Sequence, residues 1–140
     1  MVDVSSKPMS VRKAIAEGEI HVGSEIMAKI RDNQVKKGNV LTTAKLAGIM
    51  AAKSTSNLIP LCHPINLSDI RVDFEEKVDS LRAVAQVTSV SSTGVEMEAL
   101  TAVSVALLTI YDMCKSLGSQ MIIRNVRLKE KTKSEIKPCK

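Results

Sequence analysis

The stretch "SDIRVDFEEKVDSLRAVAQVTSV", residues 68–90, contains the patterns that decide the fold class. In its first part Ile70, Val72 and Phe74 alternate with charged residues, which is typical of a strand with one buried face. The second part, residues 81–90, also indicates a strand, and the polar "EKVDS" between the two parts provides a turn. We therefore predict a β-hairpin of two antiparallel strands.

Further elements are predicted on both sides of this hairpin from hydrophobic periodicity and from residues that cap or end helices. Before it, residues 11–22 are compatible with a strand or a helix, and the β-branched Ile20 and Val22 favour a strand. We then expect a helix capped by Ser24 and ending near Asn33, and a helix from Val40 to about Asn57 that Pro60 ends. After it we expect a long helix capped by Thr93 and ended near Leu117 by Gly118, then a strand over residues 121–128 and a basic tail. The long helix has an apolar stripe of Met97, Leu100, Ser104, Leu107, Leu108 and Tyr111. Helices mixed with antiparallel strands predict an α+β fold, with helices on one face of a sheet, and residues 1–140 fit a single domain.

The composition narrows the class of protein. The three cysteines, Cys62, Cys114 and Cys139, have no C-x-x-C spacing, so neither a disulfide framework nor a zinc ribbon is predicted and a reducing cytoplasm fits best. Charged residues interrupt the apolar runs before the ~20 residues that a membrane-spanning helix needs, and the first residues lack a signal-peptide core. Phe74 and Tyr111 are the only aromatic residues, which argues against a platform for stacking single-stranded bases.

The net charge of +5 is concentrated near the end of the chain. Residues 115–140 contain 8 of the 20 basic residues and 2 of the 15 acidic residues, whereas residues 1–114 are nearly balanced. A basic segment suits an anionic partner, either a phosphate group or a nucleic acid. A basic oligomeric module that binds nucleic acid without catalysis is therefore one alternative, and a solvated basic tail is another.

The sequence "LIPLCHP", residues 58–64, holds one of the two histidines between two prolines. Each proline fixes its own φ and disfavours helical backbone at the preceding residue, so Ile59 and His63 should be extended. His63 is thus presented by a stiff connector. One interpretation is a helix end followed by a strand start with a surface histidine, and the other is a binding site.

Charged residues mark both ends of the predicted long helix. Glu96 and Glu98 fall in its first turns, where carboxylates interact favourably with the helix dipole. Asp112 and Lys115 are three residues apart near its other end, where a carboxylate is unfavourable. Either Asp112 only pairs with Lys115, or it is held beside a lysine for proton transfer.

The length of this helix limits which residues can share a site. Glu98 and Asp112 are 14 residues apart, so their backbones should be roughly 21 Å apart along the axis. One subunit cannot easily bring both carboxylates to one reacting atom. If both serve one site, neighbouring chains or a long substrate must connect them, and the small-residue helix at Val40–Ala52 offers a surface where chains could meet.

Two long ordered motifs, "VKKGNVLTTAKLAGIMAAKSTSNLIPLCHP" and "TGVEMEALTAVSVALLTIYDMCK", resemble the molybdenum cofactor biosynthesis protein C family, the cyclic pyranopterin monophosphate synthases. The similarity includes "MVDVSSK" and "MIIRNVRL" and so covers nearly the whole chain. The resemblance implies a ferredoxin-like α+β fold and a homohexamer, a trimer of dimers with active sites at subunit interfaces. It also implies conversion of a cyclised 7,8-dihydro-GTP, made by a radical enzyme, to cyclic pyranopterin monophosphate with release of pyrophosphate.

The resemblance also implies roles for individual residues. Asp112 matches the catalytic carboxylate, and Lys115 and Lys37 match the lysines of the catalytic site. The substrate-binding positions that it implies are Leu61, Cys62 and His63, Met97 and Glu98, and the basic residues Arg12, Lys53 and Lys131, which we assign to the triphosphate. No dedicated metal site and no required cofactor are expected, although magnesium can accompany the substrate phosphates. Neither a nucleic acid nor a membrane is expected as a partner.

The chain departs from the family pattern at two places. The family often has a lysine-rich loop with a glycine pair after the last strand, whereas this chain has the shorter "KTKS" at residues 131–134. Asn39 stands where the family commonly has aspartate, which removes a charge but keeps a residue that can cap a helix.

Overall fold

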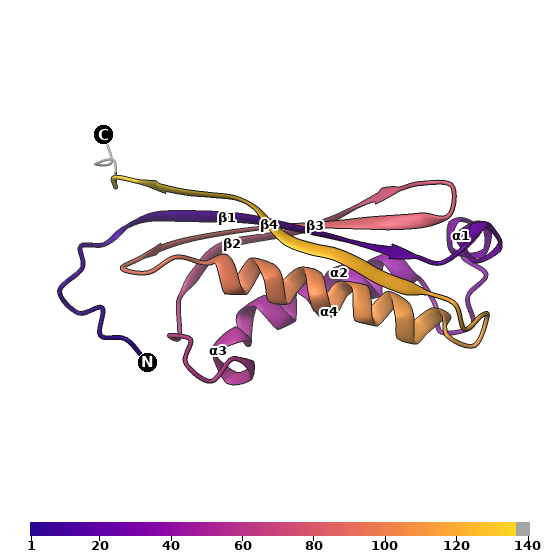
Figure 1. The fold of residues 1–140 in the computed structure, drawn as a ribbon, viewed down its shortest axis with the longest axis horizontal. Coiled ribbons are helices and arrows are strands. Elements are labelled where there is room, and N and C mark those ends of the chain that lie inside the picture. Colours follow the sequence, from indigo (N-terminus) through magenta and orange to yellow (C-terminus); the bar gives the residue numbers. More distant parts are fainter. Residues whose placement is uncertain (137–140) are drawn as a thin grey trace.

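The computed structural model describes residues 1–136, so Cys139 lies outside the described residues. In chain order the elements are β1 (Ser10–His21), α1 (Ser24–Arg31), α2 (Val40–Lys53), α3 (Thr55–Leu58), β2 (Leu67–Glu76), β3 (Ser80–Ser91), α4 (Glu96–Cys114) and β4 (Ile122–Ser134). Figure 1 shows that the N-terminal segment, α3 and the start of α4 lie at one end of the molecule. The end of α4 and α1 lie at the other.

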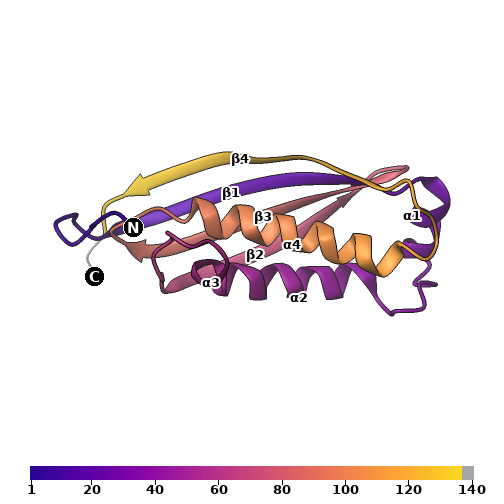
Figure 2. The ribbon, with the colours of Figure 1, turned by 60° about the horizontal axis from the view of Figure 1, so that its bottom comes forward.

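The four strands form one antiparallel sheet in the order β2-β3-β1-β4. β2 and β3 make the predicted hairpin, in which Val72 is opposite Ala85 and Phe74 is opposite Ala83. The long helices α2 and α4 both lie on one face of this sheet (Figure 2). This strand order and connectivity are those of a ferredoxin-like fold, so the predicted α+β class is confirmed.

Small residues let α2 and α4 pack closely. A Cβ atom at Gly48 of α2 would lie 2.9 Å from the carbonyl oxygen of Ala102 and 3.3 Å from the Cβ atom of Ala106, both on α4. Ala44 and Ala51 are buried on the same side of α2. The prediction that this small-residue surface is free to meet another chain is therefore wrong, because α4 of the same chain covers it.

The buried face of α4 differs from the apolar stripe predicted for it. Of that stripe Leu107 is fully buried, but Met97 and Leu108 are 38% and 57% exposed. The apolar residues that α4 buries are Ala99, Ala102, Val103, Ala106, Leu107, Ile110, Met113 and Cys114. Small residues predominate along this face because α4 packs against both the sheet and the neighbouring α2, where close approach decides which side packs inward.

By length and composition alone, α4 is the one helix among residues 1–136 that could cross a membrane, which the interrupted apolar runs did not predict. It packs against β1, β3, β4 and α2. Its apolar character is therefore explained by its position as the core helix of this domain.

Of the residues predicted to cap the N-termini of helices, only one does so in the structure. Asn39 caps α2, since its side-chain oxygen accepts a 2.8 Å hydrogen bond from a backbone N–H of the first turn. Ser24 and Thr93 do not act as caps. α1 follows Gly23, whose φ of 86° favours glycine, and α4 follows Val95, without a side-chain cap in either case.

The C-terminal ends of the helices are earlier than predicted. α2 ends at Lys53, and the single turn α3 continues the chain to Leu58. Ile59 is extended, with φ −107° and ψ 108°, as Pro60 requires. α4 ends at Cys114, short of the predicted end, and Gly118 has no positive φ.

β4 is longer than the predicted strand. It pairs with β1 as far as Ser134, which lies opposite Val11, and two register shifts let it follow β1 over this length. Residues 129–134, predicted as a basic tail, and residues 131–134, predicted as a loop, are therefore strand. The prediction failed because lysine-rich sequences without apolar alternation are compatible with an edge strand, where charged side chains remain in solvent.

Candidate active site

The carboxylate of Asp112 is held between two lysines. Lys37 Nζ lies 2.6 Å from Asp112 Oδ2 and 3.1 Å from the carbonyl oxygen of the same residue, and Lys115 Nζ lies 2.8 Å from Oδ1. All three side chains are roughly half exposed. The structure thus brings together the three residues predicted to be catalytic.

The position of Lys37 depends on the connector between α1 and α2. Val35 is buried in the core and anchors the connector. Gly38 then turns the chain with φ 100°, and its N–H donates to the carbonyl oxygen of Val35 at 3.0 Å. Asn39 caps α2 directly afterwards. Since both sides of Lys37 are fixed in this way, its side chain is directed toward the end of α4.

The two lysines keep Asp112 ionised. Hydrogen bonds from Lys115 and then from Lys37 lower the pKa of Asp112 to about 2, and Asp112 in turn raises the pKa of Lys115. A carboxylate with this pKa is a weak base. It becomes a better proton acceptor when another anion takes over the lysines, because they then stabilise its negative charge less. The cluster can therefore couple the binding of an anionic substrate to proton transfer.

A second group of predicted residues lies around the start of α4. Glu98 is 4% exposed, and burial raises the pKa of its carboxyl group. Cys62 is half-buried in the connector after α3, and its thiol pKa is raised first by burial and then by the charge of Glu98. His63 Nε2 lies 2.8 Å from the carbonyl oxygen of Val2. Leu61 and Met97 are 70% and 38% exposed, and so are accessible to a ligand.

Arg12 and Lys131 line a cavity of about 190 Å³ beside the same end of α4. Arg12 Nη2 donates to the carbonyl oxygen of Ser92 at 3.3 Å, but its buried Nε has no partner among the described residues. Lys131 Nζ lies 3.2 Å from Glu96 Oε1. A buried guanidinium donor with a free N–H, together with exposed lysines, suits an anion. Lys53 is the exposed last residue of α2.

The two groups lie at opposite ends of α4. Asp112 is in its last turn and Glu98 in its first, and the 14 residues between them correspond to roughly 21 Å of helix. In Figure 1 the last turn of α4 lies toward α1, and its first turn lies toward α3 at the other end of the molecule. Within one chain, the structure therefore does not bring the catalytic and the substrate-binding residues together.

Comparison with known proteins shows the family to which the chain belongs. Residues 1–134 match the sequence profile of the MoaC family. The chain belongs to the MoaC family. A cyclic pyranopterin monophosphate synthase from Desulforapulum autotrophicum is 52% identical over 134 residues, which cover 94% of this chain and 82% of that protein. The protein of the same name from Bacillus subtilis is 48% identical over 136 residues, covering 94% and 80%.

Some MoaC-family relatives are longer proteins. A molybdenum cofactor biosynthesis bifunctional protein from Chlorobaculum tepidum is 56% identical over 132 residues, which cover 94% of this chain but only 42% of that protein. The resemblance seen in the sequence is confirmed by these matches. Within residues 1–136 of this MoaC-family chain, no group of three His, Cys, Asp or Glu side chains could hold a metal ion.

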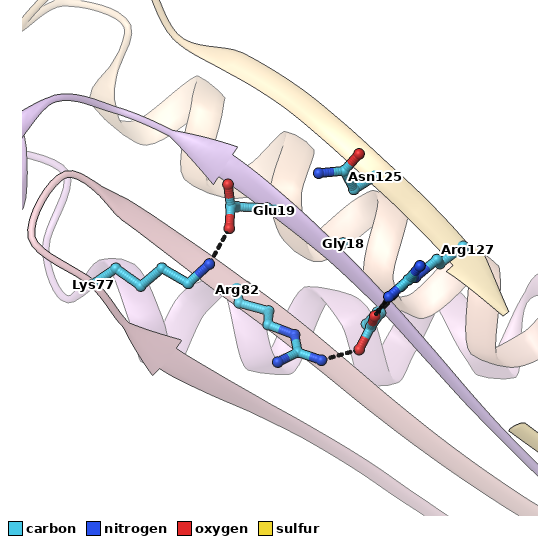
Figure 3. Close-up of a pocket in the computed structure, with 7 residues that line it drawn as sticks. Gly18, Glu19, Lys77, Arg82, Asn125 and Arg127 are labelled. Atoms are coloured by element: carbon cyan, nitrogen blue, oxygen red, sulfur yellow. Dashed lines mark hydrogen bonds and ion pairs between the residues drawn. The ribbon is translucent and has the colours of Figure 1, made fainter. Parts of the chain in front are cut away.

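A further cluster on the MoaC-family sheet was missed in the sequence. Gly18 faces α4, so its neighbours Glu17 and Glu19 lie on the sheet face that the helices leave uncovered. Both carboxylates are nonetheless buried, because basic side chains of the neighbouring strands and of the β2–β3 turn lie over them. Figure 3 shows Lys77 and Arg82 reaching them from one side and Arg127 from the other, around a cavity of about 320 Å³.

This cluster contains none of the predicted site residues. The cations are partnered within the chain: Arg127 Nη2 and Arg124 Nη2 each lie 2.6 Å from a carboxylate oxygen, of Glu17 and Glu19 respectively. Two glutamates two positions apart in one strand and two arginines three positions apart in another were the available signal. Their register was needed to recognise that they pair.

Proposed function

We propose that this chain is a cyclic pyranopterin monophosphate synthase, a lyase of molybdenum cofactor biosynthesis. Its substrate would be 3',8-cyclo-7,8-dihydroguanosine 5'-triphosphate, and its products cyclic pyranopterin monophosphate and pyrophosphate. Membership of the MoaC family and the names of the relatives support this proposal. The observation that carries it is the carboxylate of Asp112 held between Lys37 and Lys115.

These three residues form the proposed catalytic group. A triphosphate substrate brings negative charge, which competes with Asp112 for the two ammonium groups. As Lys37 and Lys115 turn to the substrate, the carboxylate of Asp112 loses their stabilising hydrogen bonds and becomes basic enough to accept a proton. In this arrangement the substrate itself activates the base, and the lysines stabilise charge that develops during the rearrangement.

The substrate-binding group is assigned to the other end of α4. Arg12, Lys53 and Lys131 would contact the triphosphate, and the cavity beside Arg12 supports this assignment. Leu61, Cys62 and His63, with Met97 and Glu98, would contact the rest of the substrate. Burial raises the pKa of Glu98, and its carboxyl group would hydrogen-bond to a polar atom of the substrate ring. Cys62 is assigned a backbone contact with the substrate, without a reaction of its thiol.

The site is proposed to be shared between chains. The roughly 21 Å along α4 between Glu98 and Asp112 is too long for one chain to place both beside one reacting atom. A homohexamer, built as a trimer of dimers with sites at its interfaces, would juxtapose the catalytic group of one chain with the binding group of another.

The proposed location is the cytoplasm. The two free thiols among the described residues, Cys62 and Cys114, fit a reducing cytoplasm.

No cofactor bound by the protein is proposed for this chemistry, and magnesium would be carried by the substrate phosphates. Neither a membrane nor a nucleic acid is proposed as a partner. The alternative of a nucleic-acid-binding module has less support, because Arg124 and Arg127, two of the basic residues of β4, are already paired with Glu19 and Glu17.

The proposal is tested by incubating the purified protein with the cyclised dihydro-GTP and measuring released pyrophosphate and the pterin product. Turnover above a protein-free control supports the proposal, and its absence in a folded protein contradicts it. Binding to nucleic acid that weakens steeply with salt and is insensitive to Asp112→Asn would instead support the alternative.

A further inference from the structure

The N-terminal segment, residues 2–7, folds back onto His63. The carbonyl oxygen of Val2 lies 2.8 Å from His63 Nε2, a contact between residues 61 positions apart. Val4 and Met9 then form part of the wall of a cavity of about 350 Å³ that His63 also lines. The segment is therefore a part of the surroundings of His63, although it precedes the first strand of the sheet.

Local hydrogen bonds give this segment a defined shape. The backbone N–H of Ser5 donates to Asp3 Oδ1 at 2.9 Å, and the N–H of Lys7 donates to the carbonyl oxygen of Val4 at 3.1 Å. The first of these bonds is an Asx turn, in which a side-chain oxygen replaces a backbone acceptor. Asp3 thus fixes the direction of the chain immediately next to the carbonyl group that meets His63.

The partner of His63 Nε2 determines where the ring carries its proton. A backbone carbonyl oxygen can only accept a hydrogen bond, so Nε2 must be the donor. In neutral His63 the lone pair then lies on Nδ1, and in the protonated ring Nδ1 carries the second N–H. Nε2 is therefore committed to the protein, and Nδ1 is the nitrogen left for a ligand.

We infer that residues 2–7 are a positioning element that holds His63 in its Nε2–H form, so that Nδ1 is the atom that accepts a proton from the substrate or donates to its phosphate. Asp3 is the positioning residue, acting through its turn rather than by contact with substrate. This inference rests on the proposed function for the identity of the substrate. The tautomer itself does not depend on that function.

Nitrogen-15 NMR of the histidine rings tests the inference without substrate. The chain has two histidines, and His21, at the far end of β1 beside Asp79, serves as an internal reference. In the wild type, neutral His63 should show a single Nε2–H tautomer. Deletion of residues 2–7 should give a mixture of both tautomers at His63 and leave His21 unchanged. The same single-tautomer pattern at His63 in both proteins would overturn the inference.

Substitutions of Asp3 separate the turn from its charge. Asp3→Asn keeps the side-chain acceptor and should retain the wild-type pattern at His63, whereas Asp3→Ala removes the turn and should give the mixture. Ser6→Ala is the matched control, because the Ser6 side chain makes no hydrogen bond among the described residues. A wild-type pattern in Asp3→Ala, or a mixture in Asp3→Asn, would contradict the role assigned to the turn.

Kinetics with the cyclised dihydro-GTP test whether Asp3 acts through His63. Asp3→Ala should lower kcat/KM about tenfold, the effect of one lost hydrogen bond of moderate strength. In a His63→Ala background the same change should have no further effect, since the residue that Asp3 positions is absent. Equal losses in both backgrounds would overturn the inference. A wild type without turnover would instead refute the proposed function, while the NMR result would still decide the tautomer.

Discussion

Lys37 Nζ lies 2.6 Å from Asp112 Oδ2, although the two residues are 75 positions apart in the sequence. The contact joins the connector before α2 to the last turn of α4. It places a second cation on a carboxylate that already pairs with Lys115, so the pKa of Asp112 is lowered to about 2. The acid–base behaviour of Asp112 is thus controlled by a long-range contact as well as by its own helix.

Asp112→Asn should preserve the fold, because the side chain is exposed, and should lower turnover by about 10²–10⁴-fold if Asp112 transfers protons. Steady-state kinetics and a thermal unfolding curve measure the two effects. Asp69→Asn is the matched control, since Asp69 is also a partly exposed carboxylate in an ion pair, with Arg71. Near-normal turnover in a folded Asp112→Asn protein would remove Asp112 from the mechanism.

Mixing two chains of strongly reduced activity should restore activity if the site is shared. Asp112→Asn and His63→Ala chains are unfolded together and refolded into hybrid oligomers, in which some interfaces receive both intact partners. Activity should then exceed that of either variant refolded alone. A mixture no more active than these controls would indicate that the two residues do not meet across an interface, and would leave the oligomeric state to a separate measurement.

Lys53→Ala should mainly weaken substrate binding, because a lysine at the end of α2 acts on the triphosphate as a point charge. The loss should be largest at low salt and become smaller as salt screens the interaction. Lys45→Ala is the control on the same helix, where Lys45 pairs with Asp73. Equal affinity of Lys53→Ala and the wild type across a salt series would assign Lys53 to a solvated helix surface.

The free energy of unfolding should fall as the solution is acidified. Hydrogen bonds from Arg82 and then Arg127 lower the pKa of Glu17 from 4.5 to about 2 in the folded protein. The resulting stabilisation is complete above pH 4.5 and is lost as the pH falls toward about 2, because protonation then favours the unfolded chain. Denaturant titrations across this range measure the slope.

Glu17→Gln should reduce this acid sensitivity and lower stability at neutral pH by about 1.5–3 kcal/mol, the range for a hydrogen bond to a charged group. Exposed Glu130→Gln, on the neighbouring strand β4, should have little effect. If Glu17→Gln unfolds with the same pH slope as the wild type, the acid sensitivity comes from other carboxylates.

Gly48→Val should destabilise the domain by about 1–3 kcal/mol, because added atoms would clash with the backbone of α4. Its Cβ atom alone would lie 2.9 Å from the carbonyl oxygen of Ala102. Met50→Ala is the control, since Met50 lies on the same helix and is 59% exposed. Unchanged stability of Gly48→Val would mean that α2 and α4 can move apart without loss of packing.

The hairpin and the fold class followed from the sequence because their signals are local. Alternation at Ile70, Val72 and Phe74 depends only on the pleat of one strand, and Pro60 ends a helix whatever lies around it. The buried face of α4 could not be predicted from the sequence, because several sides of this helix are apolar. Contact with Gly48 and the sheet decides which one packs, and that contact involves distant segments.

In the candidate site, too, some contacts could be predicted from the sequence and others could not. The pairing of Asp112 with Lys115 was expected from their spacing on one helix, and Lys37 was expected only from the family resemblance. The turn at Gly38 that directs Lys37 has no signal linking it to α4. The contact of His63 with Val2 and the pairing of Glu17 with Arg127 also required the register and path of distant segments, which periodicity does not contain.

The pairing of β1 with β4 has a consequence for synthesis of the protein. Glu17 and Arg127 are 110 residues apart, so β1 is made early, and one of its edges has no neighbour until the last strand leaves the ribosome. An unpaired edge strand can join the edge of another chain and aggregate. During this interval Glu17 and Glu19 have Arg82 and Lys77 of the β2–β3 hairpin as partners but lack the arginines of β4. β4 therefore completes these ion pairs and also closes the edge at which the unfinished sheet could join another chain.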